Sequence, residues 1–226
     1  MGDDEDGGLG CIGSMFDTAS SRSVVRVQLT KPDDSAIDIE LRCIDGEPGH
    51  VQSGQYIWPA AESLSKYLCA HWDELTSHTV IELGAGCGMA GIAAAQLGGP
   101  STSVVFTDHD PGAVSLLEEN VEINGVDSRS LSMQLEWGES LPASLVEALP
   151  RAPADNQNGP VLVIGSDLLY CAGVVRPLMK TVHEILVAHC RSSAGKTGKF
   201  VLVSSFDTGE DVEAEILALS TELNFS

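Results

Sequence analysis

The stretch that most constrains the fold is residues 80–91, which read VIELGAGCGMAG. A short apolar run ends in an acid, Glu82, and closely spaced glycines follow it. The apolar run is typical of a buried strand, and the glycines allow a tight turn because they tolerate positive φ. The unpaired N–H groups that begin the next helix suit an anionic or polar ligand group. The stretch therefore predicts a nucleoside cofactor bound on an α/β sheet.

The rest of the chain predicts what surrounds this turn. Residues 25–43 alternate between polar and apolar side chains on both sides of a turn at 31–35, which indicates an antiparallel hairpin. Further along, apolar runs at 104–108, 131–135, 161–164 and 200–205 alternate with helical patterns. This order predicts a mostly parallel sheet with helices on both faces. Residues 1–22 are predicted to be a disordered acidic tail, and 147–160 a surface loop.

Charge and cysteine content exclude several classes of protein. The 226 residues include 33 acidic and only 12 basic side chains, giving a net charge of −21. General binding to nucleic acid or to an anionic membrane needs clustered Lys and Arg, so neither is expected, whereas a protein partner is. Six cysteines without a CxxC pair predict reduced thiols and no metal site. A cytoplasmic monomer is expected, with the nucleus as an alternative location.

Several polar and aromatic side chains lie at or just past the carboxyl ends of the predicted strands. Because the carboxyl ends of parallel strands meet at one edge of the sheet, these side chains are expected to form one site. They are Glu82, Asp108, Trp137, Asp167 and Tyr170. Trp58 precedes the first helix beside a glycine, where its indole either covers a ligand or packs in the core.

The glycine-rich turn fits two cofactor templates. Gly86-x-Gly88-x-x-Gly91 matches a dinucleotide fingerprint, whereas Glu82-x-Gly84-x-Gly86-x-Gly88 matches the pattern usual for S-adenosyl-L-methionine sites. A carboxylate at Glu82 repels a pyrophosphate but suits the ammonium group of a methionine moiety. The sequence therefore favours S-adenosyl-L-methionine and keeps a nicotinamide dinucleotide as the alternative.

The motifs together resemble a known family. Trp58-Pro59, the ELGAG segment at 82–86, Asp108, Trp137-Gly138 and the SDLLY segment at 166–170 occur in the order found in seven-β-strand protein lysine methyltransferases, or methyltransferase family 16. The resemblance covers about residues 24–223. It implies an S-adenosyl-L-methionine-dependent protein-lysine N-methyltransferase with a Rossmann-like class I methyltransferase domain over residues 23–226. The family's sheet ends in two more strands, and this C-terminal strand pair is expected to be missing here.

The residues and the resemblance together give a set of expected roles. Asp167 and Tyr170 are implied to face the incoming lysine, with a helix N-cap and core packing as their respective alternatives. Two other functions stay open, an NAD(P)-dependent oxidoreductase and a catalytically silent methyltransferase-like binding protein. The expected cofactor-binding residues are Trp58, Glu82, Gly84, Ala85, Gly86, Asp108, Trp137 and Ser166.

Overall fold

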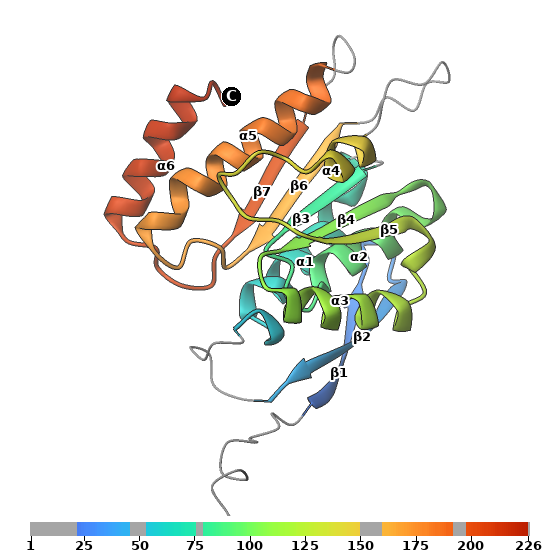
Figure 1. Ribbon diagram of the computed structural model, residues 1–226. Helices are drawn as coiled ribbons and strands as arrows, with labels where there is room; N and C mark the ends of the chain where they lie inside the picture. The colour runs from blue at the N-terminus through green and yellow to red at the C-terminus, as the bar shows by residue number, and fades with distance from the viewer. Residues whose placement is uncertain (1–21, 46–52, 76–78, 150–159, 192–197, 226) are drawn as a thin grey trace, which may run out of the picture.

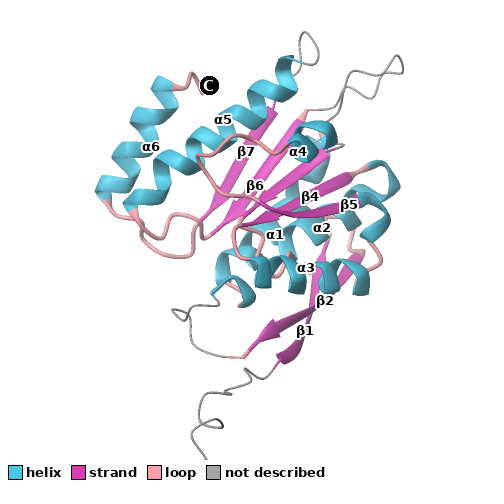
Figure 2. Cartoon of the chain, viewed as in Figure 1, coloured by secondary structure: helices cyan, strands magenta, loops and turns pink. Residues whose placement is uncertain are grey.

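The computed structural model describes residues 22–45, 53–75, 79–149, 160–191 and 198–225. The predicted acidic tail, except Arg22, and most of the predicted loop at 147–160 lie outside these residues. Within them, the molecule consists of a five-stranded sheet between two layers of helices, with a separate hairpin (Figures 1 and 2).

The predicted hairpin is present and stands apart from the main sheet. Strands β1 (Arg22–Thr30) and β2 (Ala36–Ile44) pair antiparallel, from Arg22 opposite Ile44 to Thr30 opposite Ala36. Its apolar face packs against the helices α1 (Pro59–Leu75), α2 (Met89–Gly98) and α3 (Pro111–Ile123). The hairpin thus covers the outer side of one helical layer (Figure 1).

The main sheet is entirely parallel and confirms the predicted architecture. Its strands are β3 (Thr79–Leu83), β4 (Ser103–Asp108), β5 (Ser130–Gln134), β6 (Val161–Ser166) and β7 (Gly198–Val203), in the order β5-β4-β3-β6-β7. The chain runs outward from β3 to β5 and then crosses to β6 on the other side. Ligands of such sheets bind where the strand order reverses, which here is the carboxyl end of β3 between β4 and β6.

Alternate side chains of the buried strands supply the two cores. Val80, Phe106 and Leu162 pack in the core that contains α1, α2 and the hairpin. Ile81 and Val163 pack in the opposite core, with α5 (Val175–Arg191) and α6 (Glu210–Glu222). Successive side chains of a strand point to opposite faces of the sheet, so these strands make both faces apolar. Both faces are therefore covered by helices.

Short helices complete the described chain. The helix α4 (Ala143–Ala148) overlaps the start of the predicted loop, and it forms because Leu145 and Leu149, four residues apart, are both buried. Single 3-10 turns occur at η1 (Ser53–Gln55), η2 (Gly99–Ser101), η3 (Asp127–Arg129) and η4 (Ala172–Val174). No strand follows α6 within the described residues. Among these residues, β7 has a neighbouring strand on one side only and is an edge strand of the sheet. None of the described helices has the length and apolar character needed to cross a membrane.

Candidate functional site

The glycine-rich turn between β3 and α2 forms the floor of the site. Gly84, Gly86 and Gly88 all have positive φ, at 56°, 52° and 82°. A Cβ at Gly86 would also lie 2.8 Å from the carbonyl oxygen of Gly54. Both the conformation and the close approach of backbone to backbone require glycine at this position.

The turn is tied to β4 by hydrogen bonds. The Ala85 N–H donates to the Thr107 carbonyl at 2.8 Å, and the Gly86 N–H donates to Asp108 Oδ2 at 3.0 Å. Asp108 Oδ1 accepts from the Asp110 N–H at 3.0 Å and lies 3.3 Å from His109 Nδ1. The Asp108 carboxylate therefore fixes the turn while lying in the wall of the cavity above it.

A cavity of about 320 Å³ opens at the carboxyl ends of β3, β4 and β6. Every predicted site residue except Glu82 lines it, so the structure brings nine residues from five chain segments together. Because β3 is central, Asp108 on β4 and Asp167 after β6 lie on opposite sides of the turn. The lining residues are Gly54, Tyr56, Ile57, Trp58, Ala61, Gly84, Ala85, Gly86, Cys87, Gly88, Met89, Asp108, His109, Trp137, Ser166, Asp167, Leu168 and Tyr170.

Glu82 lies behind the turn instead of in the cavity wall. Its side chain is 2% exposed, and its Oε2 accepts from the Gly91 N–H at 2.9 Å in the first turn of α2. Burial raises the pKa of this carboxyl to about 8. Glu82 thus supports the start of α2, and this placement corrects the expectation that it faces the ligand.

Asp167 joins three segments that are distant in sequence. It has a positive φ of 54°, uncommon for a residue other than glycine, and is 8% exposed. Oδ1 accepts from the Ser205 N–H at 2.7 Å and Oδ2 from the Ala60 N–H at 3.1 Å. The Ser205 hydroxyl lies 3.0 and 2.8 Å from these two oxygens. The carboxylate therefore does cap a helix, but the helix is α1 rather than the one that follows it.

The aromatic residues form walls and a rim. Trp58 and Trp137 are half-buried in the cavity lining, while Tyr170 is 62% exposed at its edge. Partial burial raises the pKa of the Tyr170 hydroxyl. The exposure of Tyr170 rules out the alternative of core packing and leaves its ring free to contact a ligand at the cavity mouth.

The structure also adds residues that the sequence did not single out. Tyr56 and Ile57 line the cavity from the segment before α1, and His109 lines it from the residue after Asp108. His109 could have been found by its position, since it too follows a strand end. Ser205, which binds Asp167, lies just beyond β7, although its predicted place was inside that strand.

The chemistry of this lining suits a nucleoside cofactor. Asp108 offers a carboxylate to ribose hydroxyls, the indoles offer flat apolar faces, and the glycine turn lets backbone come close. Burial raises the pKa of the Cys87 thiol to about 12, so this thiol is not an activated nucleophile. No group of three His, Cys, Asp or Glu side chains within the described ranges is arranged to hold a metal ion.

Comparison with known proteins gives one consistent family. A sequence model of the family described as "Lysine methyltransferase" matches residues 38–194. The protein N-lysine methyltransferase METTL21A of Danio rerio is 34% identical over 132 residues, which cover 57% of this chain and 54% of that protein. The histone-arginine methyltransferase METTL23 of Mus musculus is 29% identical, over 61% of this chain and 49% of that protein. The chain thus matches about half the length of these two relatives.

Among solved structures, a putative RNA methyltransferase, PH1948 from Pyrococcus horikoshii, shares the fold. Its TM-score is 0.50 at 20% sequence identity, and the match covers 80% of this chain and 75% of that protein. At this level of identity the likeness concerns the fold alone. It agrees with the Rossmann-like parallel sheet described above.

Proposed function

This chain belongs to the lysine methyltransferase family, and from this premise we propose that it methylates a lysine side chain of a protein, with S-adenosyl-L-methionine as the methyl donor. The observation that carries the proposal is the single cavity that joins the glycine-rich turn and Asp108 to Asp167 and Tyr170. One ligand can therefore lie over the turn while a second group enters at Tyr170.

The two halves of the cavity suit different tasks. On the β4 side, Asp108 would accept from the ribose hydroxyls of the cofactor, and Trp137 would cover its adenine. On the β6 side, Tyr170 lies at the open rim, where a side chain from another protein can enter. The net charge of −21 favours a protein acceptor over a nucleic acid.

S-adenosyl-L-methionine supplies, when bound, a methyl group that is already activated on a sulfonium sulfur. The protein then has mainly to position the acceptor and to keep its amine neutral. The apolar wall from Ile57 and Trp58 lowers the pKa of a lysine ammonium by removing water from around it. The Asp167 carboxylate would raise the pKa of a nearby lysine. This effect is weakened because the carboxylate already accepts three hydrogen bonds, from the Ala60 N–H, the Ser205 N–H and the Ser205 hydroxyl.

Asp167 accordingly aims the acceptor and holds the loop after β6, and it is not a strong base. A carboxylate has about four acceptor positions, so one remains beyond the donors from Ala60 and Ser205. The proton lost by the amine passes to solvent at the rim beside Tyr170. Family membership disfavours an oxidoreductase, while a silent binding protein is an outcome that the experiments below distinguish.

The first experiment identifies the cofactor. The shift in melting temperature and the dissociation constant are measured with S-adenosyl-L-methionine, NADH and NADPH in turn. We expect stabilisation by S-adenosyl-L-methionine alone. Stabilisation by a nicotinamide dinucleotide instead would support the oxidoreductase alternative.

The second experiment identifies the acceptor. Radiolabelled S-adenosyl-L-methionine is incubated with the protein and a cell lysate, and the labelled band is hydrolysed for amino-acid analysis. We expect methyl-lysine, whereas methyl-arginine would indicate an acceptor like that named for METTL23. Cofactor binding without any labelled protein would indicate the silent binding protein.

Variants of Asp167 test its role. Asp167→Ala is expected to abolish labelling while largely sparing cofactor binding, and to lower the melting temperature because two amides lose their partner. Asp167→Asn keeps the size of the side chain, and Ser205→Ala, the control, removes one hydroxyl but leaves the carboxylate. Full labelling by a folded Asp167→Ala protein would overturn the assignment. The cytoplasmic location and the monomeric state stay predictions of the sequence.

A further inference from the structure

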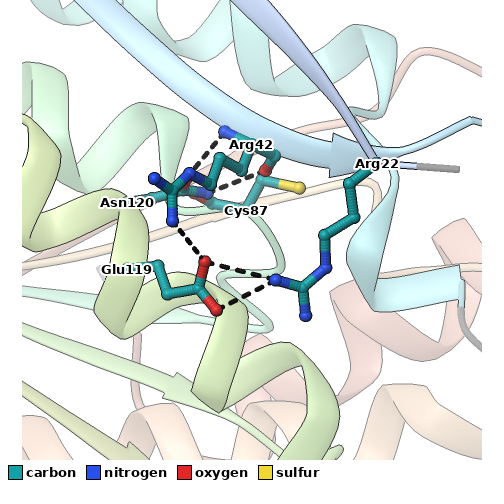
Figure 3. A network of polar contacts seen from close by, with 5 residues as sticks. All are labelled: Arg22, Arg42, Cys87, Glu119 and Asn120. Carbon is teal, nitrogen blue, oxygen red and sulfur yellow. Dashed lines mark hydrogen bonds and ion pairs between the residues drawn. The ribbon is translucent and has the colours of Figure 1, made fainter.

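Asn120 in α3 uses its whole side-chain amide to join the hairpin to the cofactor turn. The side chain is fully buried, at 0% exposure. Its Oδ1 accepts from the Arg42 N–H at 2.7 Å, and its Nδ2 donates to the Arg42 carbonyl and to the Cys87 carbonyl, both at 3.0 Å. Figure 3 shows this amide between β2 and the turn. One side chain thus contacts the backbone of two elements that are far apart in sequence.

A second asparagine, Asn124, makes the same pair of hydrogen bonds to the backbone of β2 but none to the turn. Asn124 Oδ1 accepts from the Glu40 N–H at 3.0 Å, and its Nδ2 donates to the Glu40 carbonyl at 2.7 Å. Four residues of helix rise about 6.0 Å, and two residues of strand span about 6.7 Å. Asn120 and Asn124 therefore match Arg42 and Glu40 in spacing. The two amides bond the edge of β2 as a neighbouring strand would.

Ion pairs on the outside of this contact add to the attachment of the hairpin. Glu119 pairs with Arg22 of β1 at 3.0 Å and with Arg42 of β2 at 2.6 Å (Figure 3). These side chains are partly exposed, and exposed ion pairs contribute little to stability. The buried amides are therefore the stronger link, and of the two only Asn120 reaches the turn.

The bond to Cys87 fixes one peptide plane of the turn. The Cys87 carbonyl accepts from Asn120, while the N–H on the other side of the same peptide, that of Gly88, donates to Ala85 at 2.8 Å. The Cys87 thiol donates to the Gln55 carbonyl at 3.3 Å. Without Asn120 the carbonyl would be buried without this donor, which disfavours the observed peptide orientation. Since Cys87 and Gly88 line the cavity, that orientation shapes the site.

We propose that Asn120 is a positioning residue that holds the cofactor turn through the Cys87 carbonyl, while the same amide binds the N-terminal hairpin, and that this hold on the turn sustains cofactor affinity. Its link to S-adenosyl-L-methionine rests on the function proposed above. The link to the turn itself does not, because the hydrogen bonds concern the protein alone.

The test compares Asn120→Ala with Asn124→Ala in the full chain. Asn124→Ala, the matched control, loses the bonds to β2 and one bond to the Asn120 backbone carbonyl, but Asn124 touches no part of the turn. Hydrogen–deuterium exchange of peptides that cover residues 83–91 is measured without ligand, and the dissociation constant of S-adenosyl-L-methionine is measured by calorimetry. For Asn120→Ala we expect faster exchange in the turn and about tenfold weaker binding. The reason is that burying the Cys87 carbonyl without this donor shifts the equilibrium away from the ordered turn by about tenfold. For Asn124→Ala we expect neither change.

The outcomes separate this inference from the proposed function. Equal exchange and equal affinity in Asn120→Ala and wild type would overturn the inference, as would equal effects of the two variants. If the wild type does not bind S-adenosyl-L-methionine, the proposed function fails, and the exchange data alone decide whether Asn120 holds the turn. If Asn120→Ala does not fold, Asn120→Ser replaces it, because a hydroxyl keeps one donor at the position.

Discussion

Substitution of Gly86 by alanine is the sharpest test of how the cofactor turn is built. At a φ of 52°, an L-residue costs about 1 kcal/mol more than glycine. The new Cβ would lie 2.8 Å from the Gly54 carbonyl oxygen, a backbone atom that cannot rotate away. Overpacking of this kind costs about 1–3 kcal/mol. The expected loss of unfolding free energy is therefore about 2–4 kcal/mol, the sum of these two effects.

Gly125→Ala is the matched control for this prediction. Gly125 has a φ of 63°, but a Cβ there would meet no atom within 4 Å. It should lose only the conformational part, about 1 kcal/mol, and bind S-adenosyl-L-methionine as the wild type does. Gly86→Ala should in addition bind S-adenosyl-L-methionine at least about tenfold more weakly, because the displaced cavity floor weakens its contacts. A loss of about 1.4 kcal/mol in binding free energy corresponds to a tenfold loss of affinity. Urea denaturation gives the free energies and calorimetry the affinities. Equal losses in the two variants would refute the reasoning.

Two further predictions concern titratable groups. Because the pKa of Glu82 is raised from 4.5 to about 8 in the folded protein, its contribution to stability is present below pH 4.5 and lost as the pH rises towards 8. Glu82→Gln should flatten this part of the stability profile by up to about 5 kcal/mol, as measured by urea denaturation at several pH values, and an unchanged profile would contradict the buried placement of the carboxyl. For the thiols, maleimide at neutral pH should label exposed Cys171 rapidly and spare Cys87, which is 4% exposed and has a pKa raised to about 12. Mass spectrometry of the labelled peptides reads this out, and equal rates for the two thiols would count against the closed packing of the turn.

The parts of the fold that depend on local pattern could be predicted from the sequence. The glycine spacing at 84–88 predicted a turn with positive φ, and the structure has it. Alternation at 25–43 predicted the hairpin, and the apolar runs predicted the parallel strands. The short helix at 143–148 was missed because a single pair of buried leucines is too weak a periodic signal.

Nine of the ten predicted site residues line the cavity, whereas the placement of Glu82 and the partners of Asp167 were not predicted. Glu82 is the last residue but one of β3 and Asp108 is the last residue of β4, yet Glu82 lies behind the turn and Asp108 lines the cavity. The difference depends on the register of β3 against β4, which pairs Glu82 with Phe106 and so places Asp108 two residues further toward the carboxyl edge of the sheet. The partners of Asp167 are likewise invisible in sequence, since Ala60 is 107 residues away and Ser205 is 38 residues away.

The sequence by itself determined where strands, helices and the tight turn occur, because burial periodicity and the need for glycine are properties of neighbouring residues. The tertiary structure decided which of these elements meet. It placed β6 beside β3, so that Asp167 lies across the turn from Asp108, and it brought Asn120 against both Arg42 and Cys87. Hydrogen bonds and raised pKa values depend on distances and desolvation through space, and only the folded chain sets these.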